Sequence, residues 1–402
     1  MNINGLNSSK NLALIWCCQC VTTLGLMAMV PIMPLYLAIL TNGSAVIWSS
    51  VALAAPAVTA LAVAPKIGKA CDIYGCRTLV LLSLTGFAVS MALMAFSSSI
   101  LGFLAGRLLL GASGVGVTLT AFACAASTED QRGRTLGLLQ SASAFGSLSG
   151  PIIGGILLDL WSIKPLLIAI TVFCGLAALI VSWRLEELPS LNPLKATNSS
   201  TKTGWLSNLR DPIMRNWMLA ACLGQAAAFA LVNTFVLFLE PQVAPTSLAS
   251  ITGVIHAAGW AASMLASPFW GRANEIGDTR RHYFIAGVGC AISIALLPLA
   301  NHLWQILGLR IVQGACFAAL AQSVFLALTT AKETSQQGES VGTAKGFLVL
   351  GQIVGPAVAA IFLPWWGPKE ILWMVSALFI LAAFFAIRVP RTRTLAMNPA
   401  PL

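Results

Sequence analysis

The chain has 402 residues, of which 57% are hydrophobic and only 9% are charged, with a formal net charge of +10 at pH 7. A soluble domain carries roughly 25% charged residues, so this composition excludes a globular protein with a polar surface and predicts a polytopic membrane protein. Most Lys and Arg residues lie near the amino terminus, in alternate loops or in the tail. This placement argues against a nucleic-acid partner and, because positive loops stay inside the cell, predicts that both termini are cytoplasmic.

Twelve apolar stretches follow one another along the chain, each near the length of about 20 residues that a helix needs to cross a hydrocarbon core. The first has no small-residue cleavage site after a short apolar core, so we interpret it as a retained span. The sequence therefore predicts an all-α polytopic membrane protein with twelve transmembrane helices. The expected spans are 12–40, 46–65, 78–97, 101–126, 135–158, 165–183, 214–239, 248–268, 282–300, 303–329, 341–364 and 371–388.

The longest hydrophilic stretch, 184–213, separates the spans into six and six and is rich in Pro, Asn and Ser, as a linker is. The two halves repeat each other: Arg107 matches Arg310 at a shift of 203 residues, and Pro151 matches Pro356 at a shift of 205. A duplicated six-span unit predicts two pseudosymmetric bundles, as in many secondary transporters. The expected parts are an N-terminal bundle, a cytoplasmic linker, a C-terminal bundle and a cytoplasmic tail, at 1–183, 184–213, 214–390 and 391–402.

Four motifs occur in order in the first half. The first span contains LGLMAMVPIMPLY at 24–36, the next connection contains GKACDIYGCR at 68–77, and the fourth span contains R-x3-G at Arg107. The fifth span has the pattern G-x8-G-x3-GP-x2-GG, formed by Gly137, Gly146, Gly150, Pro151, Gly154 and Gly155. With these motifs the chain resembles the major facilitator superfamily along essentially its whole length, and most closely its twelve-span drug:proton antiporter branch. The resemblance implies transport by alternating access.

The glycines of the fifth span predict a flat helix side, because helices in lipid associate by close approach across small residues. Pro151 predicts a bend, and neighbouring helices can satisfy the carbonyl group that a proline leaves free. Two interpretations remain open. The segment is either a tightly packed hinge between the halves that resists leak during export, as the resemblance implies, or a generic packing surface.

A gating role is expected for the connection between the second and third spans, at Gly68, Asp72, Gly75 and Arg77. There Asp72 would act as a charge latch that breaks and re-forms as the halves rock; the alternative is a solvated turn. The family usually has a basic residue directly after this aspartate, whereas this chain has Ile73. That departure predicts a weaker latch.

Arg107 and Arg310 each lie about seven residues inside a span, which is roughly 10 Å deep at 1.5 Å per residue. A charge at that depth costs several kcal/mol and normally faces a cavity or a partner. The resemblance implies that the first, fourth, seventh and tenth spans line a central cavity. Arg107 has an alternative role as the family's common arginine of the fourth span, serving structure or proton relay. The candidate substrate-binding residues are Arg107, Arg310, His256, Asn233, Thr234, Gln19, Thr22 and Thr23.

Two buried arginines without a buried acidic residue predict an anionic substrate. We therefore expect proton-coupled efflux of a small organic solute, such as a carboxylate siderophore. The alternatives are a multidrug exporter of lipophilic compounds and an importer or symporter of organic anions. His256 is the first candidate for the proton carrier because histidine titrates near physiological pH, although a structural hydrogen-bonding role is equally open. Glu240 and Asp159, at the outer ends of spans, are the other candidates.

The chain carries no catalytic constellation and no metal-binding pattern such as HExxH. We therefore expect no enzyme activity, no metal and no cofactor beyond the proton gradient as an energy source. The expected partners are a small-molecule substrate, protons and the lipid bilayer. Compact loops and the lack of a targeting segment predict a bacterial inner membrane, and we expect the protein to be a monomer there.

Overall fold

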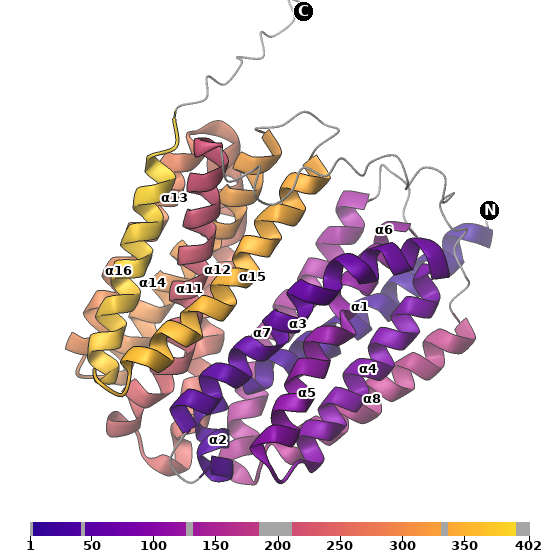
Figure 1. Ribbon diagram of the computed structural model, residues 1–402, viewed down its shortest axis with the longest axis horizontal. Coiled ribbons are helices and arrows are strands. Elements are labelled where there is room, and N and C mark those ends of the chain that lie inside the picture. The colour runs from indigo at the N-terminus through magenta and orange to yellow at the C-terminus, as the bar shows by residue number, and fades with distance from the viewer. Residues whose placement is uncertain (1–2, 42–44, 126–131, 185–210, 331–336, 391–402) are drawn as a thin grey trace, which may run out of the picture.

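The computed structural model describes residues 3–41, 45–125, 132–184, 211–330 and 337–390 (Figure 1), and within these ranges the regular elements are all helices. The expected all-α class is thus confirmed. The long helices are α1 (Ile3–Met29), α2 (Met33–Thr41), α3 (Ala45–Tyr74), α4 (Cys76–Phe96), α5 (Ile100–Ser113), α6 (Val115–Ala125), α7 (Arg132–Leu160), α8 (Lys164–Arg184), α11 (Pro212–Leu239), α12 (Leu248–Ile276), α13 (Thr279–Leu296), α14 (Leu303–Thr330), α15 (Gln337–Phe362) and α16 (Pro368–Ile387). Three short 3-10 helices are η2 (Glu240–Gln242), η3 (Pro245–Ser247) and η4 (Leu297–Leu299).

The described helices account for the twelve expected spans. Ten segments are long and apolar enough to cross a membrane. Two shorter apolar stretches, Ile47–Val63 in α3 and Gly346–Phe362 in α15, lie where the remaining two spans are expected. The prediction of twelve transmembrane helices is therefore confirmed.

Two of the expected spans are each divided into two helices. The first breaks between Met29 and Met33, around Pro31, because proline has no N–H group to donate to the preceding turn. The fourth breaks at Gly114, whose φ of 60° is the left-handed conformation that glycine adopts without a steric penalty. Neither break was expected from hydropathy alone.

The connection expected at 66–77 is mostly helical. Helix α3 continues to Tyr74, and the single residue Gly75 separates it from α4. Gly75 has a φ of 86°, so this abrupt reversal depends on glycine. Helix α3 extends beyond its apolar stretch because a polar segment outside the hydrocarbon core can stay helical in water.

The helices form two bundles, α1–α8 and α11–α16, each with its own hydrophobic core (Figure 1). Helix α1 begins and α16 ends at the same end of the molecule, which we call the terminal end. The two bundles diverge towards the terminal end and come together at the opposite end (Figure 1). This arrangement is the two-bundle architecture expected from the duplicated sequence.

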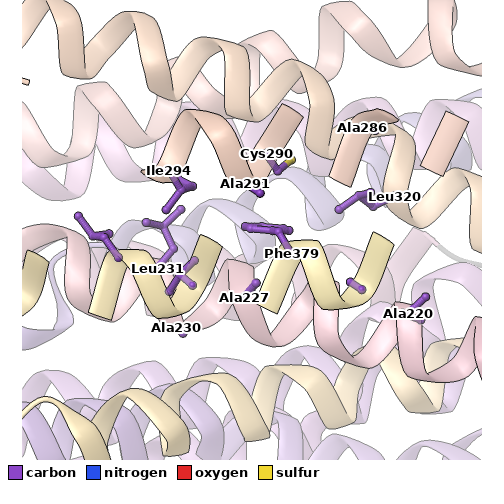
Figure 2. Packing of buried hydrophobic residues seen from close by; sticks show 14 of the residues in the cluster. Ala220, Ala227, Ala230, Leu231, Ala286, Cys290, Ala291, Ile294, Leu320 and Phe379 are labelled. Atoms are coloured by element: carbon purple, nitrogen blue, oxygen red, sulfur yellow. The ribbon is translucent and has the colours of Figure 1, made fainter. Parts of the chain in front are cut away.

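Small side chains bring the helices of the C-terminal bundle close together. Figure 2 shows Phe379 of α16 pointing towards Cys290 and Ala291 of α13. Ala227 and Ala230 of α11 are buried in the same cluster. In lipid such interfaces depend on close packing rather than on hydrophobic burial. These alanines therefore help to fix the C-terminal bundle, whose helices α12 and α14 carry the polar groups described below.

Candidate functional site

A cavity of about 160 Å³ lies between the two bundles. Helices α11, α12, α14 and α15 of the C-terminal bundle supply nearly all of its lining. The N-terminal bundle contributes only apolar atoms, from Met27 of α1 and from Val30 just after it. The polar chemistry of the cavity therefore belongs to the C-terminal half of the chain.

Helical spacing directs the polar side chains into this cavity. His256, Trp260 and Ser263 of α12 all line it, because residues three or four apart share one face of a helix. Arg310 and Gln313 of α14 line it for the same reason. The cavity is thus built where one face of α12 meets one face of α14.

Arg310 is the cationic centre of the cavity and is only 4% exposed. Its Nη1 atom donates a hydrogen bond to Oε1 of Gln313 at 2.5 Å, and its Nη2 atom lies 3.4 Å from Nδ1 of His256. Its Cζ atom lies 5.0 Å from the ring centroid of Phe235, a cation–π contact. Its Nε atom is buried without a hydrogen-bond partner.

The charge of Arg310 is not neutralised within the described part of the chain. No Asp or Glu is found among the described residues that line the cavity. The ion pairs of the described residues are those of Asp278 with Arg280 and Arg281. A buried, unpaired cation favours an anion as its partner, so the cavity is electrostatically suited to an anionic ligand.

Arg107 lies in a different environment from Arg310. It is 1% exposed, and its Nε atom donates a hydrogen bond to the backbone oxygen of Ala52 in α3 at 2.8 Å. Arg107 does not line the cavity. In this conformation the structure therefore does not bring the two arginines together at one site.

The candidates on α11 lie in helix contacts. Nδ2 of Asn233 donates to Oγ of Ser50 in α3, a hydrogen bond of 2.5 Å between the two bundles. Thr234 is fully buried and donates to the backbone oxygen of Ala230 at 3.0 Å. Neither lines the cavity; Asn233 instead joins the bundles.

The candidates on α1 face α7 or their own helix. Nε2 of Gln19 donates to Oγ1 of Thr23 and to Oγ of Ser143 in α7, both at 3.0 Å. Thr22 donates to the backbone oxygen of Cys18 at 2.8 Å. These side chains stabilise contacts within the N-terminal bundle and do not line the cavity.

The glycine pattern of α7 has two faces. On the first face, a Cβ atom added at Gly146 or Gly150 would lie 2.8 or 2.7 Å from a backbone oxygen of α1, and one added at Gly154 would also overlap α1. Gly137, by contrast, has open space around it. Three members of the pattern thus allow direct backbone contact within the N-terminal bundle.

The second face of α7 contacts the other bundle. A Cβ atom on Gly155 would overlap the backbone of Ala249 in α12. One on Gly253 of α12 would overlap the carbonyl group of Pro151. Here two helices from different bundles pack backbone against backbone, which closes the molecule at the end opposite the termini.

Asp159, one of the proton-coupling candidates, joins the bundles at this closed end. Its Oδ1 accepts a hydrogen bond from the backbone nitrogen of Ala249 at 3.1 Å, and its Oδ2 accepts one from Ser250 at 2.6 Å. A carboxylate of one bundle thus caps the first turn of a helix in the other. Glu240, the other outer candidate, is exposed at the start of η2.

The expected gating residues are only partly described. Gly68 and Asp72 lie within α3, but their surroundings and the carboxylate of Asp72 fall outside the described part of the structure. Arg77 donates a hydrogen bond to the backbone oxygen of Ser182, near the end of α8. Its counterpart Arg280 reaches the backbone oxygen of Val389 in the same way. Both arginines connect helices within one bundle.

Sequence reasoning missed several residues of the cavity. Gln313 follows Arg310 by three positions and Trp260 follows His256 by four, so helical spacing alone could have found both. Phe235, which contacts the guanidinium but does not line the cavity, carries no such signal because it comes from another helix.

A comparison with protein families matches the chain to the Major Facilitator Superfamily over residues 15–259 and 241–402. The staphyloferrin B transporter of Staphylococcus aureus (strain NCTC 8325) is 32% identical over 395 residues, covering 94% of this chain and 92% of that protein. The multidrug resistance protein MdtG of Proteus mirabilis (strain HI4320) is 25% identical over 411 residues, covering 98% and 100%. The family and these relatives are transporters rather than enzymes.

Solved structures of transporters share the fold. The human organic anion transporter MFSD10 (TETRAN) has a TM-score of 0.68 at 20% identity, covering 94% of this chain and 99% of that one. The nucleoside transporter NupG has a TM-score of 0.79 at 11% identity, covering 94% and 100%. At such identities the likeness concerns the fold alone.

Proposed function

Because the chain belongs to the major facilitator superfamily, we propose that it exports a small organic anion in exchange for protons, by alternating access. It is a transporter with many membrane-spanning helices. The observation that carries the proposal is the unpaired charge of Arg310 in the cavity between the bundles. An anion bound there would neutralise a buried cation that no described acidic residue of the cavity lining neutralises.

We propose a carboxylate-bearing metabolite of the siderophore class as the substrate. The staphyloferrin B transporter, at 32% identity over nearly the whole chain, supports this class by its name. The substrate-binding candidates predicted from the sequence remain part of the proposal. Arg310 and His256 are the two of them that line the cavity. A clamp formed by both arginines would require Arg107 to leave its hydrogen bond with Ala52.

Export is proposed as the direction of transport because the antiporter glycine pattern is complete in α7. Its glycines support a tight seal between α7 and α12 at one end of the molecule. With both termini in the cytoplasm, that end would face outwards and the described conformation would be closed to the outside. His256, Glu240 and Asp159 remain the proton-coupling candidates, in a monomer of a bacterial inner membrane.

A multidrug exporter of lipophilic compounds is the second candidate function. Apolar side chains supply most of the cavity lining, among them Phe229, Val232 and Phe317. The similarity to MdtG supports the same alternative. An exporter of lipophilic cations, however, would leave the charge of Arg310 repelling its own substrate.

The experiment that tests the function compares metabolites in the medium and cells of three strains: the parent, a deletion strain, and the deletion strain carrying Arg310→Gln. We expect an organic acid to disappear from the medium and accumulate inside cells of both mutant strains. An unchanged profile of acids, together with lost efflux of ethidium, would contradict the proposal and favour the multidrug alternative. Uptake of the acid by right-side-out vesicles would identify an importer instead.

A further inference from the structure

The hydrogen bonds around Arg310 fix the roles of its neighbours. A guanidinium group has five N–H donors and no acceptor. His256 Nδ1, 3.4 Å from Nη2, must therefore accept, and Gln313 Oε1, 2.5 Å from Nη1, accepts as well. His256 is thus neutral in this arrangement, with its proton on Nε2.

The polar atoms that these three side chains leave free are mainly donors. The acceptor atoms of His256 and Gln313 are both used by Arg310. Their other polar atoms, Nε2 of the histidine and Nε2 of the glutamine amide, carry only hydrogen. The Nε–H of Arg310 is buried and has no partner. Each of these three side chains lining the cavity therefore keeps an N–H donor, and their one remaining acceptor site is the second lone pair of Gln313 Oε1.

We propose that Arg310, His256 and Gln313 form a donor-rich site for one carboxylate group, held by the C-terminal bundle alone. The inference rests on the proposed function, because it names the chemical group that an anion exporter would recognise. An ionised carboxylate is an acceptor-only group, and its hydrogen bonds to charged donors are about twice as strong as neutral ones. An ammonium group would be repelled by the guanidinium of Arg310, and the neutral oxygens of Gln225, Ser263 and Gln352 elsewhere in the lining would not offset that charge.

The contact with Phe235 makes the arrangement rigid. Its ring centroid lies 5.0 Å from Cζ of Arg310, a cation–π contact that restrains the position of the guanidinium. His256 and Gln313 then act as positioning residues as well as donors, because each holds one Nη atom. The N-terminal bundle faces the cavity with Met27 and Val30 only. As the bundles rock, the carboxylate can therefore stay with one bundle until the cavity is open to water.

The test uses the full-length protein in lipid nanodiscs and three probes of one shape, namely benzoate, benzamide and benzylammonium. Binding is measured by ligand-observed NMR and by the shift of the thermal-unfolding midpoint. We expect benzoate to bind and the neutral and cationic probes to bind at least tenfold more weakly. Equal binding of benzoate and benzamide by the wild-type protein would overturn the site.

Two variants test the roles of individual atoms. Gln313→Glu places a carboxylate next to Arg310, so benzoate affinity should fall more than tenfold. Gln313→Met introduces no charge, so its benzoate affinity should fall less than that of Gln313→Glu. His256→Asn keeps an acceptor for Arg310, but its side chain is shorter and its amide N–H groups do not reach the position of histidine Nε2. Benzoate affinity should therefore fall about fivefold to tenfold, the value of one hydrogen bond. Unfolding midpoints without ligand show that each variant folds. Wild-type affinity for benzoate in both Gln313→Glu and His256→Asn would overturn the inference.

The outcomes separate this site from the proposed function. If benzoate binds as expected but the deletion strain secretes every acid normally, the export proposal fails and the site stands. If acid export is confirmed and Gln313→Glu exports at the parental rate, the function stands and the site is wrong.

Discussion

Arg107 and Arg310 occupy equivalent positions in the two halves of the chain, yet only Arg310 faces the cavity between the bundles. Arg107 instead donates to the backbone oxygen of Ala52 inside the N-terminal bundle. The equivalent arginines of the two halves therefore have different structural roles. One arginine connects helices, and the other presents its charge to the cavity.

This difference predicts that the same substitution affects mainly stability at Arg107 and mainly export at Arg310. Arg107→Gln should destabilise the protein by about 1–3 kcal/mol, the cost of leaving buried polar groups unpaired. Arg310→Gln should change the unfolding midpoint less, because removing a buried charge that faces the cavity offsets the loss of its hydrogen bonds to Gln313 and His256, while it abolishes anion export. Arg310→Lys should also impair export, since an ammonium cannot reproduce the planar donor set. Full anion transport with normal expression in both glutamine variants would rule out a role for either arginine.

The contact between α7 and α12 predicts a conformational effect of a single methyl group. Gly253→Ala would place a Cβ atom into the carbonyl group of Pro151, so the two bundles could no longer meet at the closed end. We expect loss of export and a larger distance between spin labels on the two bundles at that end. Gly308→Ala in the same bundle is the control, because nothing lies within 4 Å of the added atom. A parental distance in Gly253→Ala would show that the contact is dispensable.

Much of this architecture could be predicted from the sequence. Hydropathy gave the twelve spans, and the constant offset between Arg107 and Arg310 gave the two bundles. The glycines predicted close packing, because few other reasons exist for so many of them in one helix. Helical spacing also predicts that Arg310 and Gln313 share a face.

The rest depended on contacts between distant segments. The carbonyl group of Ala52 and the ring of Phe235 lie on other helices, so no local pattern assigns them to Arg107 or Arg310. Hydropathy also missed the breaks at Pro31 and Gly114, because both lie in uniformly apolar segments. The rotation of each helix about its axis decides which polar groups face the cavity, and packing sets that rotation.

The orientation in the membrane can be tested with single cysteines in a background without native ones. Tyr74 is 68% exposed near the terminal end, and Trp161 is 78% exposed at the opposite end. With both termini in the cytoplasm, a membrane-impermeant maleimide should label Trp161→Cys in intact cells. It should label Tyr74→Cys only after the membrane is permeabilised. The reverse pattern would show that the topology is inverted.

The start of α13 predicts a pH-dependent contribution to stability. Asp278 accepts hydrogen bonds from Nε and Nη2 of Arg280 at 3.0 and 2.7 Å, and these bonds lower the pKa of Asp278 below its ordinary value of 3.8. A lowered folded-state pKa stabilises the protein above the ordinary value, and the contribution is lost as the pH falls through the lowered one. Asp278→Asn should therefore lower the unfolding midpoint at neutral pH, and the difference should vanish in acid. A difference that does not change with pH would assign the effect to the helix cap alone.

The last prediction concerns the carboxylate that holds the closed end together. Asp159 of α7 accepts from the first-turn nitrogens of Ala249 and Ser250 in α12, and a helix cap of this kind contributes about 1 kcal/mol. Asp159→Ala should thus shift the equilibrium about fivefold towards the conformation that is open at this end, seen as faster labelling of Ile251→Cys from outside. Glu370→Ala is the matched control, since this carboxylate lies beside Gly367 at the start of its own helix. If labelling in Asp159→Ala equals that in the control, the glycine contact alone closes the molecule.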